Sequence, residues 1–152
     1  MIIYYEHRPV TSPISPDWER LEEDFHYWSE RLGGKHTIRA GFEFDWDSIR
    51  RWKTVFYWWL KGRAKVAALI HDDLYYTGEF AGVKITRLQA DQVFHDAMAE
   101  EMRRHREYLK LTGRRLKYRE FVDSVRRNAI YVGVRVGGYD AWNDYRAADE
   151  GP

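Results

Sequence analysis

The chain contains no cysteine, which excludes disulfide bonds, thiolate metal sites and cysteine nucleophiles. It also lacks long apolar runs: the longest, 55–60 and 66–70, fall far short of the roughly 20 residues that a membrane-spanning helix needs. The first residues do not show the basic-then-apolar pattern of a signal peptide. We therefore expect a soluble protein without a transmembrane segment, in which only histidines and carboxylates could hold a metal.

The net charge is only +1, but the charges are segregated along the sequence. An acidic stretch covers residues 17–30, and a basic stretch carries Arg103, Arg104, Arg106, Lys110, Arg114, Arg115, Lys117, Arg119, Arg126 and Arg127. Such a basic stretch suits nucleic acid, anionic lipid or an acidic partner, or it is simply a solvated helical surface. Nucleic acid is the least favoured partner, because the overall charge is near neutral and no DNA- or RNA-reading module matches.

Aromatic residues make up 16% of the chain and include seven tryptophans, more than a core of this size requires. Some of them are expected in an interface, with another protein or within a homo-oligomer. The length of 152 residues suits a single domain with one core. We divide it into an arm and linker over 1–16, a core over 38–142 and a flexible acidic tail over 143–152.

In the N-terminal half, the residue pattern predicts one helix and little other regular structure. Residues 1–5 suggest a short strand or arm, and the turn-rich linker 11–16 ends at Ser15, a candidate helix N-cap. Apolar residues then recur at helical spacing up to Gly33, which predicts an amphipathic helix over 18–32. Residues 37–44 alternate like a strand.

The C-terminal half predicts three long helices. The first covers 53–76 with a break near Gly62, and 77–85 is a loop. Thr86 and Gln89 form a capping box that begins a helix to Leu111. The third helix, 118–136, ends at a glycine pair and is expected to bury Phe121, Val122, Val125, Ala129, Val132 and Val136. The expected fold class is α+β, mainly helical, with three or four packed helices and a small N-terminal β element.

One group of residues could carry chemistry. On the helix over 53–76, a four-residue step brings Tyr75 onto the face of His71, whereas Asp72 is rotated by about 100°. Asp91 lies on an otherwise apolar face of the next helix, so it needs a buried partner. If His71 donates one N–H to Asp91, its other nitrogen is a candidate general base. Alternatively, the three residues form a satisfied hydrogen-bond network that only fixes helix packing.

Three segments carry a resemblance to a known family: G-F-E-F-D-W-D-S-I-R over 41–50, A-A-L-I-H-D-D-L-Y over 67–75 and R-L-Q-A-D-Q-V-F over 87–94. Together they resemble a family of unknown function found in tailed phages and prophages, over about residues 38–142. Arg50 departs from the pattern, in which a proline usually follows the Ser-Ile pair. The resemblance implies a virion or bacterial cytoplasmic location, with other virion proteins or a host protein as partners.

The last two segments also resemble the phospholipase A2 core, in which H-D-x-x-Y is followed by A-D-Q-x-F. This resemblance implies that His71 is the general base for hydrolysis of a membrane lipid, that Asp91 orients it and that Tyr75 supports the pair. It also implies a calcium ion bound by Asp72. The glycine-rich calcium loop of such enzymes is missing, and Asp45 and Asp47 are the residues that could replace its oxygen ligands.

Two functions follow from these patterns. The first is a phage accessory or structural protein that acts through protein contacts. The alternative is a calcium-dependent, phospholipase A2-like esterase acting on bacterial membrane lipid, and whether the chain is an enzyme stays open at this point.

Overall fold

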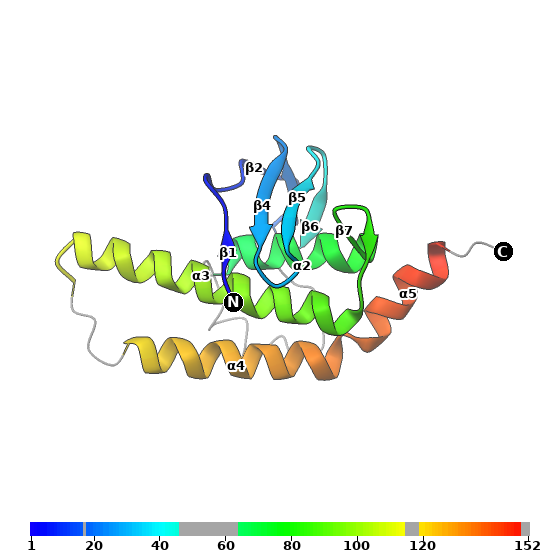
Figure 1. The fold of residues 1–152 in the computed structure, drawn as a ribbon. Coiled ribbons are helices and arrows are strands. Elements are labelled where there is room, and N and C mark those ends of the chain that lie inside the picture. Colours follow the sequence, from blue (N-terminus) through cyan, green and yellow to red (C-terminus); the bar gives the residue numbers. More distant parts are fainter. Residues whose placement is uncertain (17, 46–63, 115–118, 150–152) are drawn as a thin grey trace.

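The computed structural model describes residues 1–16, 18–45, 64–114 and 119–149, and in it a β layer lies across a stack of helices (Figure 1). The helices are α2 (Lys65–Thr77), α3 (Arg87–Leu111), α4 (Arg119–Gly137) and α5 (Tyr139–Asp149). α2 lies directly under the β layer, α3 runs between α2 and α4, and α4 forms the opposite edge of the molecule. The expected mainly helical α+β class is confirmed.

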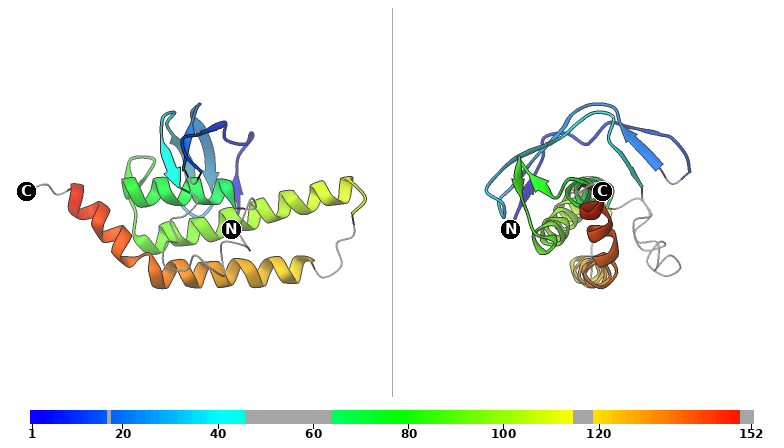
Figure 2. Two further views of the ribbon diagram at one scale, coloured as in Figure 1. Left: turned by 180° about the vertical axis from the view of Figure 1, so that it is seen from behind. Right: turned by 90° about the vertical axis from the view of Figure 1, so that its right-hand side faces the viewer.

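Two three-stranded antiparallel sheets make up the β layer and curve together over the helices (Figure 2). The first has the order β1-β4-β5 and the second the order β2-β3-β6. Their strands are β1 (Ile3–Tyr4), β2 (Thr11–Pro13), β3 (Trp18–Leu21), β4 (Phe25–Ser29), β5 (Gly34–Ile38) and β6 (Glu43–Asp45).

The prediction of a helix over 18–32 is wrong, because this segment forms β3 and β4. In β4 the side chains of Phe25, Tyr27 and Ser29 are buried, whereas His26 and Trp28 are exposed, which is the period of a strand. The apolar residues that fit helical spacing also fit two strands connected by a bend at 22–24. Aromatic residues favour strands, and β4 gains a partner on each side, so pairing within the sheet decides the outcome.

Ser15 is correspondingly not a helix N-cap. Its backbone carbonyl accepts a hydrogen bond from Trp18 N (3.3 Å) in the turn that joins β2 to β3. The segment 11–16, expected as a linker, therefore contributes a strand. The short strand expected over 1–5 is confirmed as β1, and the strand expected over 37–44 is divided between β5 and β6.

The two central helices, α2 and α3, form where the sequence predicts them. Helix α2 covers the last part of the range expected over 53–76 and ends one residue beyond it, at Thr77. Residues 53–63 of that range lie outside the described part of the chain. The capping box of α3 is confirmed: Gln89 N donates to Thr86 Oγ1 (3.2 Å), and Thr86 N donates to Gln89 Oε1 (2.8 Å). Between the two helices, the expected loop contains a short hairpin of β7 (Glu79–Phe80) and β8 (Val83–Lys84).

Helix α4 forms as predicted, but the prediction of its buried face is wrong. Phe121 is 71% exposed and Val136 68%, and Val122, Val125 and Val132 are also exposed. The buried residues are Asp123, Ile130 and Val134, on the opposite side of the helix. The segment after Trp142, expected as a flexible tail, is helical as far as Asp149.

One cluster of buried apolar side chains joins the β layer to α2, α3 and α4. It runs from Ile3 and Tyr27 in the sheet through Leu69 and Ile70 of α2 to Met98 of α3. Among the helices of the described ranges, none is long and apolar enough to cross a membrane.

Candidate functional site: a buried histidine and carboxylate network

Helices α2 and α3 bring His71, Tyr75 and Asp91 together, as the sequence predicts. The Tyr75 hydroxyl donates to Asp91 Oδ1 (2.5 Å), and His71 Nε2 lies 3.4 Å from the same oxygen. All three residues are buried. The one-turn spacing on α2 places the rings of His71 and Tyr75 against each other, with their centroids 4.0 Å apart and their planes tilted by 39°.

Asp91 is completely inaccessible to solvent and has a third partner, Arg135 of α4, whose Nη1 donates to Oδ2 (2.6 Å). Burial by itself raises the pKa of Asp91, but the hydrogen bonds from His71, Tyr75 and Arg135 outweigh it and hold the pKa below its usual value. Arg135 was not predicted as a site residue. Its only signal in the sequence is that a lone cation interrupts the apolar stretch 132–136.

The second nitrogen of His71, which we expected to be free, faces another carboxylate. Nδ1 lies 3.7 Å from Asp72 Oδ1, an ion-pair distance that is longer than a hydrogen bond. Burial lowers the pKa of His71, whereas Asp72 and Asp91 raise it, and the net direction is upward. The ring also packs against Phe94, with centroids 4.7 Å apart. This environment favours an imidazolium held between two carboxylates over a neutral base that accepts a proton from water.

The end of α4 and the start of α5 cover Tyr75. A Cβ at Gly138 would lie 2.6 Å from the Tyr75 hydroxyl, so only glycine leaves room for it at this position. The Trp142 ring packs edge-on against the Tyr75 ring, with centroids 5.2 Å apart. From α5, Arg146 Nη2 donates to the backbone carbonyls of Tyr75 and Tyr76 at the end of α2.

The described residues do not fit the calcium site that the phospholipase resemblance implies. Among them there is no group of three or more His, Asp or Glu side chains that could hold a metal ion. Asp72 is directed at His71, and its side chain is only 16% exposed. Asp45 pairs with Trp18 in the β3–β6 ladder, but its side chain, like Asp47, lies outside the described part of the chain.

A second pair, of the partly buried His36 and the buried Asp73, joins the β layer to α2, and the sequence did not reveal it. His36 Nε2 lies 2.8 Å from Asp73 Oδ2, while His36 Nδ1 accepts a hydrogen bond from Ala81 N (2.8 Å). Because Nδ1 is the acceptor, Nε2 carries the proton and donates it to Asp73. Burial raises the pKa of Asp73 and outweighs the opposing effect of His36. This pair fixes β5 and the β7–β8 hairpin against α2.

A buried glutamate of α3 caps α2. Glu101 Oε2 accepts a hydrogen bond from Ala67 N (3.0 Å), one of the free N–H groups in the first turn of α2. Ala64, at the N-cap position, offers no side-chain acceptor. Burial raises the pKa of Glu101 to about 7, although its hydrogen bonds from Ala67 and Val66 and the charges of Arg8 and Arg104 oppose this shift. The sequence did not predict that Glu101 caps α2, because nothing in the local pattern distinguishes it from other glutamates of α3.

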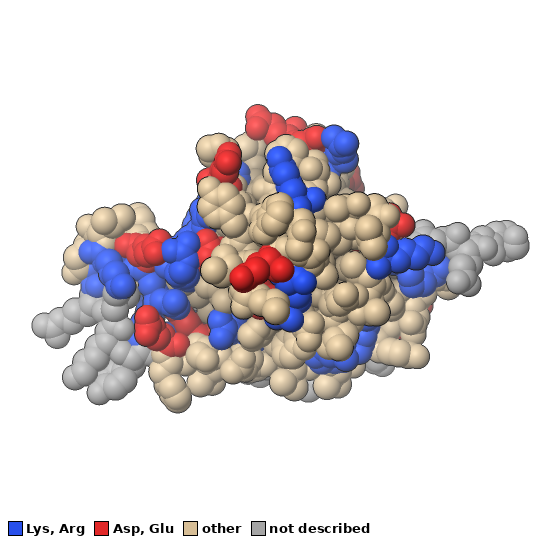
Figure 3. All heavy atoms as spheres, viewed as in Figure 1, with Lys and Arg blue, Asp and Glu red and all other residues tan. Residues whose placement is uncertain are grey.

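Three cations of the basic stretch are paired with acidic side chains on the helices. Arg103 and Arg104 both bind Glu100 (2.7 Å each), and Arg106 binds Asp123 (3.2 Å). Blue and red atoms accordingly interleave at the end of the molecule that carries the C-terminal part of α3 (Figure 3). At these three positions the positive charge is balanced within the chain.

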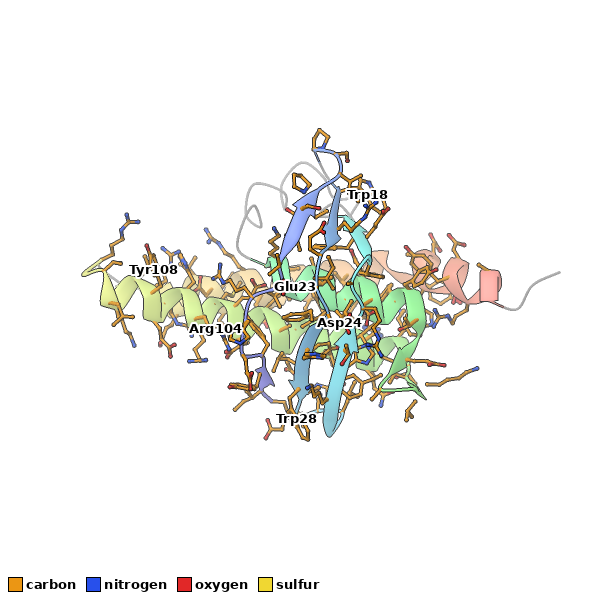
Figure 4. All side chains as sticks on the ribbon, turned by 90° about the horizontal axis from the view of Figure 1, so that it is seen from above. Trp18, Glu23, Asp24, Trp28, Arg104 and Tyr108 are labelled. Carbon is orange, nitrogen blue, oxygen red and sulfur yellow. The ribbon has the colours of Figure 1, made fainter. Side chains whose placement is uncertain are left out.

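A groove of about 490 Å³ lies on the β layer, away from His71. Its walls are the segment 4–10 and the segment 23–28, with Lys35 on the neighbouring strand. Tyr4 and Trp28 face each other across β1 and β4 and are about half exposed. Figure 4 shows Trp28 at one end of the β layer and Trp18 at the other, with Glu23 and Asp24 between them.

Comparison with known proteins gives a family but no activity. No curated protein and no solved structure matches the chain. A family model described as a protein of unknown function, DUF1353, matches residues 19–109. The match begins in β3, earlier than the resemblance over 38–142 suggests, and ends in α3 before α4 begins. It includes His71, Tyr75 and Asp91 but not Arg135. The chain therefore belongs to the DUF1353 family of proteins of unknown function.

Proposed function

We propose that this chain is a phage-type accessory or virion-associated structural protein, which acts through contacts with other virion or host proteins. The observation that carries the proposal is the exposed cross-strand pair of Tyr4 (54% exposed) and Trp28 (48%) on the groove of the β layer. The phage assignment itself comes from the sequence motifs over 41–50, 67–75 and 87–94.

The composition of the groove suits a protein partner. Half-exposed aromatic rings next to a concave surface are the typical anchors of protein interfaces. The groove also carries charges of both signs, with Glu23 on one wall and Lys35 on the neighbouring strand. Such a mixture can pair with polar groups at the rim of an interface while the aromatic rings supply apolar contact area.

The closed state of the His71 network supports a structural role for it. Asp91 has three partners and no solvent exposure, and both nitrogens of His71 face carboxylates. A water molecule to be activated would have to displace one of these partners. A saturated network of this kind fixes the relative position of helices, here α2, α3 and α4.

The protein composition of purified phage particles tests the proposal. In particles produced by the strain that carries the gene, we expect the chain at a constant ratio to the major capsid protein, measured by quantitative mass spectrometry. The double substitution Tyr4→Ala and Trp28→Ala should lower incorporation by about tenfold or more, as loss of interface anchors does. Trp18→Ala is the matched control, because Trp18 is 44% exposed but does not line the groove. Particles that lack the wild-type chain would contradict the proposal.

A second candidate is a phospholipase A2-like esterase. The observation that favours it is that His71, Tyr75 and Asp91 meet as the H-D-x-x-Y and A-D-Q-x-F motifs require. Its test is fatty acid release from mixed phospholipid vesicles in the presence of calcium, with wild type, His71→Gln and Asp91→Asn proteins shown to be folded by circular dichroism. We expect no release above background for any of them. Wild-type release that both substitutions abolish would establish the esterase and displace the structural role of the network.

A further inference from the structure

On one face of α4 the apolar spacing of the sequence predicts buried side chains, but the side chains are exposed. At 100° per residue, Phe121, Val125, Asn128, Val132 and Val136 fall within an arc of about 80°. We call these five residues the α4 stripe. Its members are exposed, and the buried residues Asp123, Ile130 and Val134 lie on the opposite side of the helix. The stripe contains no charged residue.

The stripe has the length and the spacing of a helix-pairing surface. Its members are separated by four, three, four and four residues, close to the heptad spacing at which two helices pack along a common seam. From Phe121 to Val136 it extends about 22 Å along the helix. Exposed apolar patches of this extent mark interaction surfaces in folded proteins. In Figures 1 and 2, α4 forms an outer edge of the molecule.

The order of side chains along the stripe is close to a palindrome. If a second α4 packs antiparallel about a two-fold axis near residues 130 and 131, Val125 meets Val136 of the copy. Asn128, whose Oδ1 lies 3.0 Å from His95 Nε2 of α3 in the same chain, borders Val132 of the copy. Phe121 meets Tyr139, the exposed first residue of α5. Valine thus packs on valine, and the aromatic rings meet at the two ends. An isologous two-fold interface requires this kind of self-complementarity, in which residue i contacts j and j contacts i.

We propose that two copies of this chain form an antiparallel, two-fold symmetric dimer through the α4 stripe. Helix α4 lies across the molecule from the β layer (Figure 1), so the groove is not part of the proposed contact between the copies. The dimer therefore presents two grooves, and its formation does not depend on the function proposed for them.

Sedimentation velocity over protein concentrations of about 1 to 100 μM is the first test, because this range covers micromolar dissociation constants. We expect wild type to sediment as a dimer in the upper part of this range. Val132→Asp places a charge at the centre of the stripe and should weaken the dimer by about 100-fold or more. Val83→Asp is the matched control, because Val83 is 67% exposed in the β7–β8 hairpin, outside the stripe. A monomer at every concentration, or a dimer that Val132→Asp leaves intact, would overturn the proposal.

Cross-linking tests the antiparallel arrangement, and the absence of cysteine in the chain makes every engineered thiol unique. Val125→Cys and Val136→Cys proteins are prepared separately, mixed and treated with a short bismaleimide. We expect cross-linking between the two different variants to exceed cross-linking within either one by about tenfold, because identical positions lie roughly 16 Å apart along antiparallel helices. Preferential cross-linking of each variant to itself would show a parallel arrangement and would contradict the proposed dimer.

Discussion

The hydroxyl of Tyr75 donates a hydrogen bond of 2.5 Å to Oδ1 of Asp91, a carboxylate with no solvent exposure. Burial and this bond together raise the pKa of Tyr75, while the same bond helps to lower the pKa of Asp91. The pair connects α2 to α3, and Arg135 extends the connection to α4. The stability of the three-helix stack should therefore depend on this contact.

Removing the Tyr75 hydroxyl should destabilise the fold without changing its shape. We expect Tyr75→Phe to lower the free energy of unfolding by about 1–3 kcal/mol, because a buried carboxylate oxygen loses a charge-assisted donor. Asp91→Ala should lower the free energy of unfolding by about 3–5 kcal/mol, because it leaves the buried His71 and the partly buried Arg135 without their shared carboxylate. Urea denaturation followed by circular dichroism measures both values. Tyr76→Phe is the control, since Tyr76 is 59% exposed and its substitution should change stability by less than about 0.5 kcal/mol.

The raised pKa of Glu101 should make stability depend on pH in an unusual direction. A glutamate with a pKa of about 7 in the folded state and the ordinary 4.5 in the unfolded chain binds its proton more tightly when folded. Its contribution to stability is therefore complete below pH 4.5 and is lost as the pH rises through 7. The loss amounts to at most about 3 kcal/mol, from the size of the pKa shift.

Glu101→Gln separates this effect from other titrations, because glutamine stays neutral and can still accept the hydrogen bond from Ala67. The variant should match wild type near pH 4 and be more stable than wild type at pH 8, as measured by urea denaturation across this range. Glu107→Gln, in the same helix but 54% exposed at its side chain, should show no such divergence. Parallel pH profiles for wild type and Glu101→Gln would show that the carboxyl of Glu101 ionises normally.

Two glycines near the end of α4 should respond to alanine with opposite signs. At Gly138 a Cβ meets the Tyr75 hydroxyl at 2.6 Å and the Val134 carbonyl at 2.8 Å, so Gly138→Ala should cost about 1–3 kcal/mol. At Gly133, inside the helix, a Cβ meets nothing within 4 Å, so alanine should stabilise by about 0.5–1 kcal/mol. Thermal unfolding of both variants at one low protein concentration checks the prediction. A stable Gly138→Ala protein would show that the end of α4 moves to accommodate the methyl group.

Arg146 should hold α5 on the body of the protein. Its guanidinium donates to the last carbonyls of α2 and lies 5.0 Å from the centre of the Trp142 ring. We expect Arg146→Met to speed amide hydrogen exchange in residues 139–149 while leaving exchange in α3 unchanged. Arg114→Met serves as the control, since Arg114 is exposed beyond the end of α3. Equal protection of 139–149 in both variants would mean that the apolar contact of Trp142 is sufficient to hold α5.

The sequence by itself determined the features that depend on local spacing. The Thr86–Gln89 capping box is a four-residue motif, so the start of α3 follows from it alone. Helical periodicity placed Asp91 beside Phe94 and Met98 on a buried face, and the cost of an unpaired buried carboxylate predicted its contact with His71 and Tyr75.

The tertiary structure decided everything that depends on a partner distant in the sequence. Phe25 to Ser29 became a strand because β1 and β5 supply neighbours on both sides, which no local pattern reveals. Arg135 and Glu101 acquired their roles because packing places α4 beside Asp91 and α3 beside the first turn of α2. Periodicity identified the apolar face of α4, but it could not tell whether that face is covered by the same chain. Burial is a property of the assembled fold, because an apolar stripe has the same spacing whether it meets a core or a second molecule.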